Sequence, residues 1–397
     1  MTAKKQIKEN NRKIEDNKPS LSKENKELMR KNLMKNLRCQ GFSIVKNTLV
    51  FDSSSKENLR KLNSHSVEFV LEKNKWLIDK YDDTFLKKYI VDGKSLDPKN
   101  IEARIVQVED DYHAALFRWI KLHWSIPISA GYGRRLRYIV FDDTNGGVIG
   151  IIGLGDPVYS LTDRDNLIGW SPGQKSTKLK HLMDAFVLGS VPPYNMVLGG
   201  KLVASLVGSK EVFNDFKKKY GGKKSLIRGE CFDGNLVAVT TASALGKSSL
   251  YDRIKIPGGP EFMHIGWTRG SGEFHFMNGY YEKLSGIVKS SGYTGKNKKW
   301  GSGFRSRRVV VRKALSLLEL PTKFQYHGIK REIFMAPLGE NWKDFLLEKH
   351  KRFKPYDMPV ADISEYMKER WMIPRSQRYN NYKFFNSSSY SLGKINL

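Results

Sequence analysis

Two apolar stretches in the middle of the chain constrain its fold more than any other feature. They read R-L-R-Y-I-V-F from residue 135 and V-I-G-I-I-G-L from residue 148, with D-D-T-N-G-G between them. Stretches so rich in β-branched and aromatic residues favour β-strands. The Asn145-Gly146 dipeptide is a strong signal for the tight turn of a hairpin. The sequence therefore predicts a strand, a turn and a second strand over residues 135–154.

The segments that follow this hairpin alternate between helix and strand patterns. Two stretches predict helices, residues 211–220 and 247–254. Three stretches predict strands, residues 225–231, 236–242 and 261–267. Alternation of this kind predicts an α/β fold with a mixed sheet.

Composition divides the chain into four segments. Residues 1–25 are polar and basic with little to bury, which predicts a flexible arm. Residues 26–105 predict a mostly helical N-terminal unit, with helices around 28–37, 57–63 and 66–81 and a short strand over 45–51. Residues 106–280 contain the α/β core. Residues 281–397 form a basic extension in which cations and aromatic residues are mixed.

The charge of the chain indicates its class of partner. The 397 residues include 69 Lys and Arg against 41 Asp and Glu, a net charge of +28. An excess of this size repels itself in the compact state and suits a polyanionic partner. Nucleic acid, DNA first, is the expected partner, and an anionic membrane is the second candidate.

Other classes of protein find little support in the sequence. No run approaches the roughly 20 apolar residues that span a bilayer, so we expect no membrane association. The N-terminus has no apolar segment typical of a secretory signal, which predicts a cytoplasmic protein. Cys39 and Cys231 are too few for a disulfide framework or a Cys-rich zinc site, and the histidines lie singly. We therefore assign no metal site.

Residues 191–203 read V-P-P-Y-N-M-V-L-G-G-K-L-V, in which a glycine pair precedes a helix. This order resembles the acetyltransferase superfamily called GNAT. There, a strand ending in V-x-P-x-Y-R precedes a glycine turn whose amides hold the pyrophosphate of coenzyme A. The resemblance implies a GNAT-like core, with Gly199, Gly200 and Lys201 as candidates for binding phosphate. It also makes Tyr251 a catalytic candidate, in the position of the tyrosine that protonates the departing thiolate.

Two residues depart from the GNAT pattern. Asn195 replaces the expected Arg or Gln, and Leu198 replaces the first glycine of the turn. A leucine side chain stands where backbone should approach phosphate. Acetyl-coenzyme A is therefore not expected as a cofactor, and we assign none.

A second resemblance depends on several long motifs in one order. They are S-I-P-I-S-A-G-Y-G-R-R-L-R-Y-I-V-F-D-D from residue 125, R-D-N-L-I-G-W-S from 164 and T-T-A-S-A-L-G-K-S-S-L-Y-D-R from 240. This succession resembles the Druantia protein A family of a bacterial anti-phage defence system and covers residues 105–280. It implies a role in defence, with other Druantia proteins as partners. It supplies no catalytic residues.

Three aspartates are candidates for chemistry. Asp163 and Asp165 stand two residues apart, which in an extended chain directs both carboxylates to one side, where a divalent metal or an arginine would suit them. A turn stabilised by its own Asp side chains is the alternative. Asp184 lies in apolar company, where a carboxylate is either paired or perturbed. Asp165 and Asp184 join Tyr251 as catalytic candidates.

Cations near glycines and hydroxyls are candidates for binding phosphate, because the guanidinium fork of arginine grips phosphate through two donors. Ordinary ion pairs are the alternative. The G-K-S sequence at 246–248 is not a P-loop, because the leading glycine of that motif is missing. Ser248 then either caps a helix or binds phosphate. The candidates of this group are Arg134, Arg135, Arg137, Arg164, Lys247, Ser248 and Arg269.

The run from Lys296 to Lys313 contains eight Lys or Arg and no acid. Its cations could neutralise phosphates while Trp300 stacks on unpaired bases. A solvated face, or a surface that docks an acidic subunit, is the alternative. The candidates in this run are Lys298, Lys299, Trp300, Arg305, Arg307 and Arg308.

The leading hypothesis is a defence component that binds nucleic acid. Whether the chain is an enzyme stays open. The alternatives are an acyltransferase on the GNAT-like scaffold, a transposase-like nuclease that uses clustered Asp, and an adaptor that docks other defence subunits.

Overall fold

The computed structural model describes residues 22–128, 131, 133–224, 229, 231–291, 293 and 304–393. It divides the chain into two compact units. Unit 1 takes Met1–Phe69 and Arg269–Lys330, and unit 2 takes Val70–Thr268 and Arg331–Leu397. Each unit is therefore built from separate stretches of chain and cuts across the contiguous segments expected from composition.

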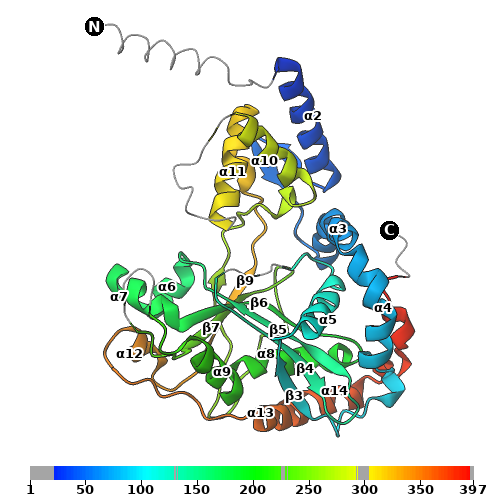
Figure 1. Ribbon diagram of the computed structural model, residues 1–397, viewed down its shortest axis with the longest axis vertical. Coiled ribbons are helices and arrows are strands. Elements are labelled where there is room, and N and C mark those ends of the chain that lie inside the picture. Colours follow the sequence, from blue (N-terminus) through cyan, green and yellow to red (C-terminus); the bar gives the residue numbers. More distant parts are fainter. Residues whose placement is uncertain are drawn as a thin grey trace. The chain divides into compact units, whose positions relative to one another are not determined.

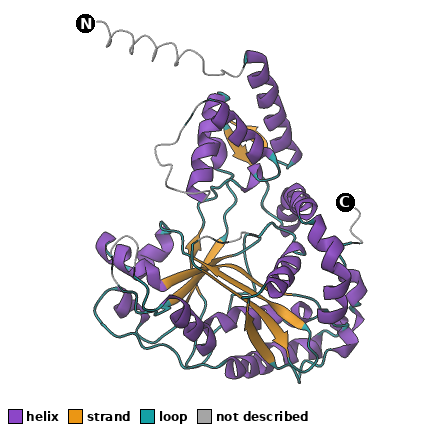
Figure 2. Ribbon diagram, in the orientation of Figure 1, coloured by secondary structure: helices purple, strands orange, loops and turns teal. Residues whose placement is uncertain are grey.

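Unit 2 contains a seven-stranded sheet, which Figure 2 shows in orange. The strand order is β3-β4-β5-β6-β7-β9-β8, and the pairing is antiparallel except between β6 and β7. The mixed α/β fold class is thus confirmed. The strands are β3 (Ala103–Gln107), β4 (Arg135–Asp142), β5 (Val148–Gly155), β6 (Leu182–Ser190), β7 (Ala238–Ala242), β8 (Met263–Trp267) and β9 (Glu332–Pro337).

Helices cover both faces of this sheet (Figure 1). The helices of unit 2 are α4 (Lys75–Tyr89), α5 (Asp111–Leu122), α6 (Thr162–Ile168), α7 (Pro172–Lys178), α8 (Gly199–Ser205), α9 (Lys210–Tyr220), α12 (Trp342–Leu346), α13 (Val360–Met367) and α14 (Ile373–Arg378). Side chains alternate along β4. Leu136, Tyr138 and Val140 belong to the core cluster that includes α8 and α13. Phe141 points the other way, against Tyr89 of α4 and His113 of α5.

The predicted hairpin is confirmed as β4 and β5. At the turn, the amide of Asp142 donates to the carbonyl of Gly147 at 2.8 Å. Gly146 has a φ of +72°, a backbone conformation that glycine adopts without strain. The predicted helix after the glycine pair is confirmed as α8, and all seven of its residues are buried.

Two local predictions are wrong. Residues 247–254 form turns rather than a helix. The carbonyls of Ser249, Leu250 and Asp252 accept hydrogen bonds from the Lys201 ammonium. They therefore do not accept the backbone hydrogen bonds that a helix would require. Residues 45–51 are not one strand: they take in the last residue of the first strand, the turn and the second strand of a small hairpin. Most of the predicted strand 225–231 lies outside the described residues.

Unit 1 consists of helices around this small hairpin. Its strands are β1 (Ser43–Val45) and β2 (Thr48–Val50), and its helices are α2 (Lys23–Cys39), α10 (Tyr280–Ser290) and α11 (Phe304–Leu317). Helix α3 (Lys56–Lys73) begins in unit 1 and ends in unit 2. In α2, Leu33 and Leu37 are buried, and most of the other residues are polar. Within the part of the chain described, no helix has the length and apolarity needed to cross a bilayer.

Candidate nucleic-acid interface

Arg134 is held by groups inside unit 2. Its guanidinium forms an ion pair with Asp156 at 2.6 Å and donates to the carbonyls of Lys180 and Leu182. It also lies 5.3 Å from the ring centroid of Phe216. These contacts engage the guanidinium donors that a phosphate would need.

Arg164, which belongs to α6, has a similar role. The side chain is fully buried, donates to the carbonyls of Val158 and Tyr159, and pairs with Asp165 at 2.8 Å. Lys175 from α7 reaches the second oxygen of Asp165 at 2.6 Å. Of the two partners that the sequence suggested for Asp165, a metal or an arginine, the structure shows the arginine. A lysine is a second partner of the same carboxylate.

The extended geometry expected around Asp163 and Asp165 is wrong. Both residues lie in the first turn of α6, where residues two apart point to different sides of the helix. Among the described residues, no group of three or more His, Cys, Asp or Glu is arranged to hold a metal ion.

Asp184 lies in β6 and receives hydrogen bonds from two neighbours. They are the hydroxyl of Thr240 on the adjacent β7 and the amide of Val158, the latter at 2.9 Å. Burial raises the pKa of Asp184, and the two hydrogen bonds and nearby Arg164 oppose that rise. This carboxylate joins strands and a loop of the core.

The glycine turn is filled by the protein itself. A Cβ on Gly200 would lie 2.8 Å from Leu250, and one on Gly199 would lie 2.8 Å from the Tyr194 carbonyl. Lys201 donates to three carbonyls of the 249–252 turn at 2.6–3.1 Å, and its ammonium lies 4.5 Å from the Trp371 ring centroid. Burial, followed by the charge of Arg253, lowers the pKa of Lys201 to about 8.

Tyr251 lies in the core. Its ring stacks on Phe262, with the ring centroids 5.5 Å apart. Burial raises the pKa of its hydroxyl, and a hydrogen bond with Thr241 opposes that rise. Ser248 does not cap a helix: its hydroxyl accepts from the amide of Leu250, and its own amide donates to Glu332 at 2.7 Å. Lys247 is exposed.

Arg135 and Arg137 make fewer internal contacts. Arg135 is exposed and donates to the carbonyl of Gly131 at 3.2 Å. Arg137 lies over the ring of Phe117 on α5, 5.8 Å from its centroid. The structure brings these two arginines together with Arg118 and Lys121 of α5, which the sequence analysis missed.

Part of the basic run lies outside the described residues. Lys298, Lys299 and Trp300 are in that part, and so is the side chain of Arg305 at the start of α11. Arg308 faces the interior of unit 1, where it donates to Ser271 at 3.3 Å and lies 3.7 Å from the buried carboxylate of Glu273. Arg307 lies 3.8 Å from the sulfur of Met277, and Arg269 is exposed.

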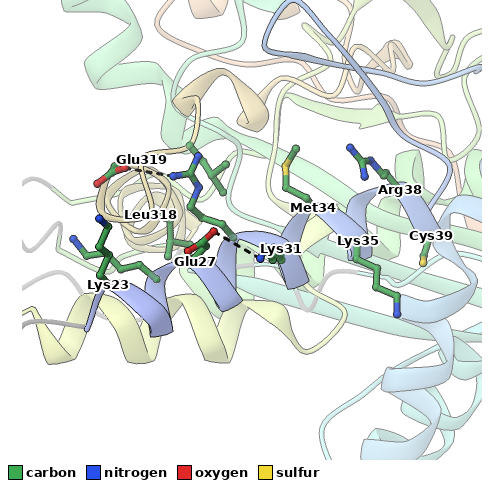
Figure 3. Close-up of a pocket in the computed structure, with 12 residues that line it drawn as sticks. Lys23, Glu27, Lys31, Met34, Lys35, Arg38, Cys39, Leu318 and Glu319 are labelled. Atoms are coloured by element: carbon green, nitrogen blue, oxygen red, sulfur yellow. Dashed lines mark hydrogen bonds and ion pairs between the residues drawn. The ribbon is translucent and has the colours of Figure 1, made fainter.

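Helix α2 carries a group of six cations that sequence reasoning missed. It lines a cavity of about 950 Å³ together with the end of α11 (Figure 3). Two acidic residues, Glu27 and Glu319, also line the cavity and pair with Lys31 at 3.7 Å and Arg30 at 3.4 Å. The cations of this surface, called the α2 surface below, are Lys23, Lys26, Arg30, Lys31, Lys35 and Arg38.

The fold defines a mixed α/β protein with a separate, strongly basic helical unit. The family described as Druantia protein DruA matches residues 53–348. The Druantia protein DruA of Escherichia coli (strain UMEA 4076-1) is 38% identical over 303 residues, which cover 76% of this chain and 75% of that protein. The chain belongs to the DruA family, which confirms the resemblance inferred from its motifs. No solved structure matches it significantly.

Proposed function

We propose that this chain acts in Druantia anti-phage defence by binding nucleic acid, DNA first, through the α2 surface. The observation that carries the proposal is the uneven distribution of charge. Unit 1 has 29 Lys and Arg against 11 Asp and Glu, a net charge of +18, and unit 2 has 40 against 30, a net charge of +10. The smaller unit thus carries most of the excess positive charge.

The cations of the α2 surface are suited to phosphate contacts. Lys23, Lys35 and Arg38 are exposed, and neither Lys35 nor Arg38 forms an ion pair with another described residue. Phosphate contacts release counterions and supply affinity without reading bases. This surface therefore favours binding that depends on salt more than on sequence.

We also propose that the core of unit 2 is GNAT-like. The support is that β4, β5 and β6 are neighbours in one sheet and that α8 follows β6, in the order the resemblance implies. Lys201 and Leu250 fill the glycine turn, so we do not extend this proposal to acetyl transfer.

The test is a salt series of DNA binding by the full chain. The variant replaces Lys26, Lys35 and Arg38 by Gln, and its matched control replaces Lys351, Arg352 and Lys354 of unit 2 by Gln. For a duplex, loss of three phosphate contacts should flatten the log–log salt slope by about 2–3, similarly across sequences. The control should keep the wild-type slope.

An unchanged slope in the α2 variant would contradict the proposed interface. If wild-type protein does not bind DNA or RNA but captures an acidic Druantia subunit through α2, the adaptor hypothesis replaces it.

A further inference from the structure

Four cations of unit 2 converge from two elements. Arg135 and Arg137 are two residues apart on β4, so their side chains leave the same face of the sheet. Arg118 and Lys121 are three residues apart on α5 and share one side of that helix. Helix α5 packs on this face, since Phe117 lies under the Arg137 guanidinium and His113 lies against Phe141.

The partners of the three arginines carry no negative charge. Arg118 lies 6.0 Å from the ring centroid of Trp76, Arg135 donates to a carbonyl, and Arg137 lies over Phe117. Within the described residues none of these three arginines forms an ion pair with Asp or Glu. Arg134 and Arg164 of the same unit, in contrast, both have carboxylate partners.

The residues of the neighbouring strand that pair with the two β4 arginines are glycines. Gly153 is paired with Arg137 and Gly155 with Arg135 in the antiparallel register. Glycine has no side chain, so β5 contributes no carboxylate at these two paired positions. A Cβ at Gly153 would lie 2.5 Å from the Phe186 ring, and the Lys121 ammonium lies 5.9 Å from the centroid of that ring.

The electrostatics agree with this geometry. Burial, followed by the charges of Arg118, Arg137 and Arg135, lowers the pKa of Lys121 to about 8. Burial, then Arg135 and Arg118, also lowers the pKa of Arg137. Like charges gathered at a half-buried position repel one another, and a bound anion would remove that repulsion.

We propose that Arg118, Lys121, Arg135 and Arg137 form a binding site for a phosphoryl group, separate from the α2 surface. Guanidinium groups at alternate positions of β4 can each offer two donors to phosphate oxygens, and Lys121 adds a point charge. The ligand class is a phosphorylated compound, either a free phosphate ester or the terminal phosphate of a nucleic acid.

The test titrates the full chain with inorganic pyrophosphate by calorimetry. Arg137→Gln and Arg135→Gln should each weaken binding about tenfold to hundredfold, because each loses a charge-assisted pair. The Arg352→Gln control should bind like wild type. Without pyrophosphate, Arg137→Gln should melt at or above the wild-type temperature, since a repulsive charge is gone, which separates lost binding from lost folding.

A second arm identifies the source of the phosphate. If a 5′-phosphate strengthens oligonucleotide binding in wild type but not in Arg137→Gln, the ligand is a nucleic-acid end. If pyrophosphate binds and the 5′-phosphate has no effect, the ligand is a small phosphate ester.

Two outcomes overturn the site: no pyrophosphate binding up to about a millimolar, or equal affinity in wild type and both variants. The α2 triple variant should keep its pyrophosphate affinity, so failure of the proposed DNA interface and failure of this site are distinguishable.

Discussion

The two units use positive charge in opposite ways. In unit 1, α2 presents cations to the outside, and its acidic residues pair with only some of them. In unit 2, Arg134, Arg164 and Lys201 turn inward and donate to carbonyls and carboxylates of the fold. Sequence reasoning treated these three cations as candidates for phosphate, but their donors are engaged within the unit.

The comparison shows that formal charge overstates the charge available to a ligand. A buried guanidinium with several internal acceptors contributes to stability, and its removal leaves those acceptors without partners. An exposed lysine contributes little to stability and can meet a phosphate. Substitutions in the two units should therefore separate stability from binding.

The largest effect is expected from Arg164→Met. The substitution leaves the carbonyls of Val158 and Tyr159 without their donor and removes a buried partner of Asp165. We expect the free energy of unfolding to fall by about 3–5 kcal/mol, measured by urea denaturation. Arg352→Met, at an exposed site of the same unit, is the control and should change it by less than about 0.5 kcal/mol. Similar small changes for both would mean that Arg164 does not support the fold.

A smaller effect is expected from Lys201→Met. Methionine retains much of the apolar stem beside Trp371 but donates nothing to the carbonyls of Ser249, Leu250 and Asp252. We expect a loss of about 2–3 kcal/mol in urea denaturation, since buried acceptors lose their donor. Hydrogen exchange in residues 247–254 should accelerate in the variant. Unchanged exchange there would argue against Lys201 as the anchor of this turn.

Sequence reasoning succeeded where the determining signals are local. The Asn145-Gly146 turn and the glycine pair before α8 are read from adjacent residues, and both elements form as predicted. It failed where distant residues decide. Strand β9 inserts between β7 and β8 although about ninety residues separate it from β7, and no local pattern specifies that pairing. The sequence of residues 247–254 favours a helix, but the carbonyls of this segment accept hydrogen bonds from Lys201 instead of from helical amides.

The same limit applies to the candidate sites. Arg135 and Arg137 were found because they stand beside glycines, whereas Arg118 and Lys121 join them only through the packing of α5 on β4. The K-x-x-x-R-K-x-x-x-K-x-x-R spacing of cations from Lys26 to Arg38 was visible in the sequence and indicates a basic helix. The same segment also fits an ordinary amphipathic helix with a solvated polar face, so its sequence alone does not assign it a ligand.

The smallest stability effect is expected from Lys35→Gln in unit 1. Lys35 is exposed near the last turn of α2, has no ion pair with a described residue, and is replaced by a residue of nearly equal helix propensity. We expect the free energy of unfolding to change by less than about 0.5 kcal/mol in urea denaturation. DNA affinity should nevertheless fall, and the salt slope should flatten by about one, because one phosphate contact is lost. Lys351→Gln in unit 2 should leave both unchanged. If Lys35→Gln loses stability but keeps the wild-type salt slope, the contrast between the two units is wrong. This exposed cation of unit 1 would then stabilise the fold and would not bind phosphate.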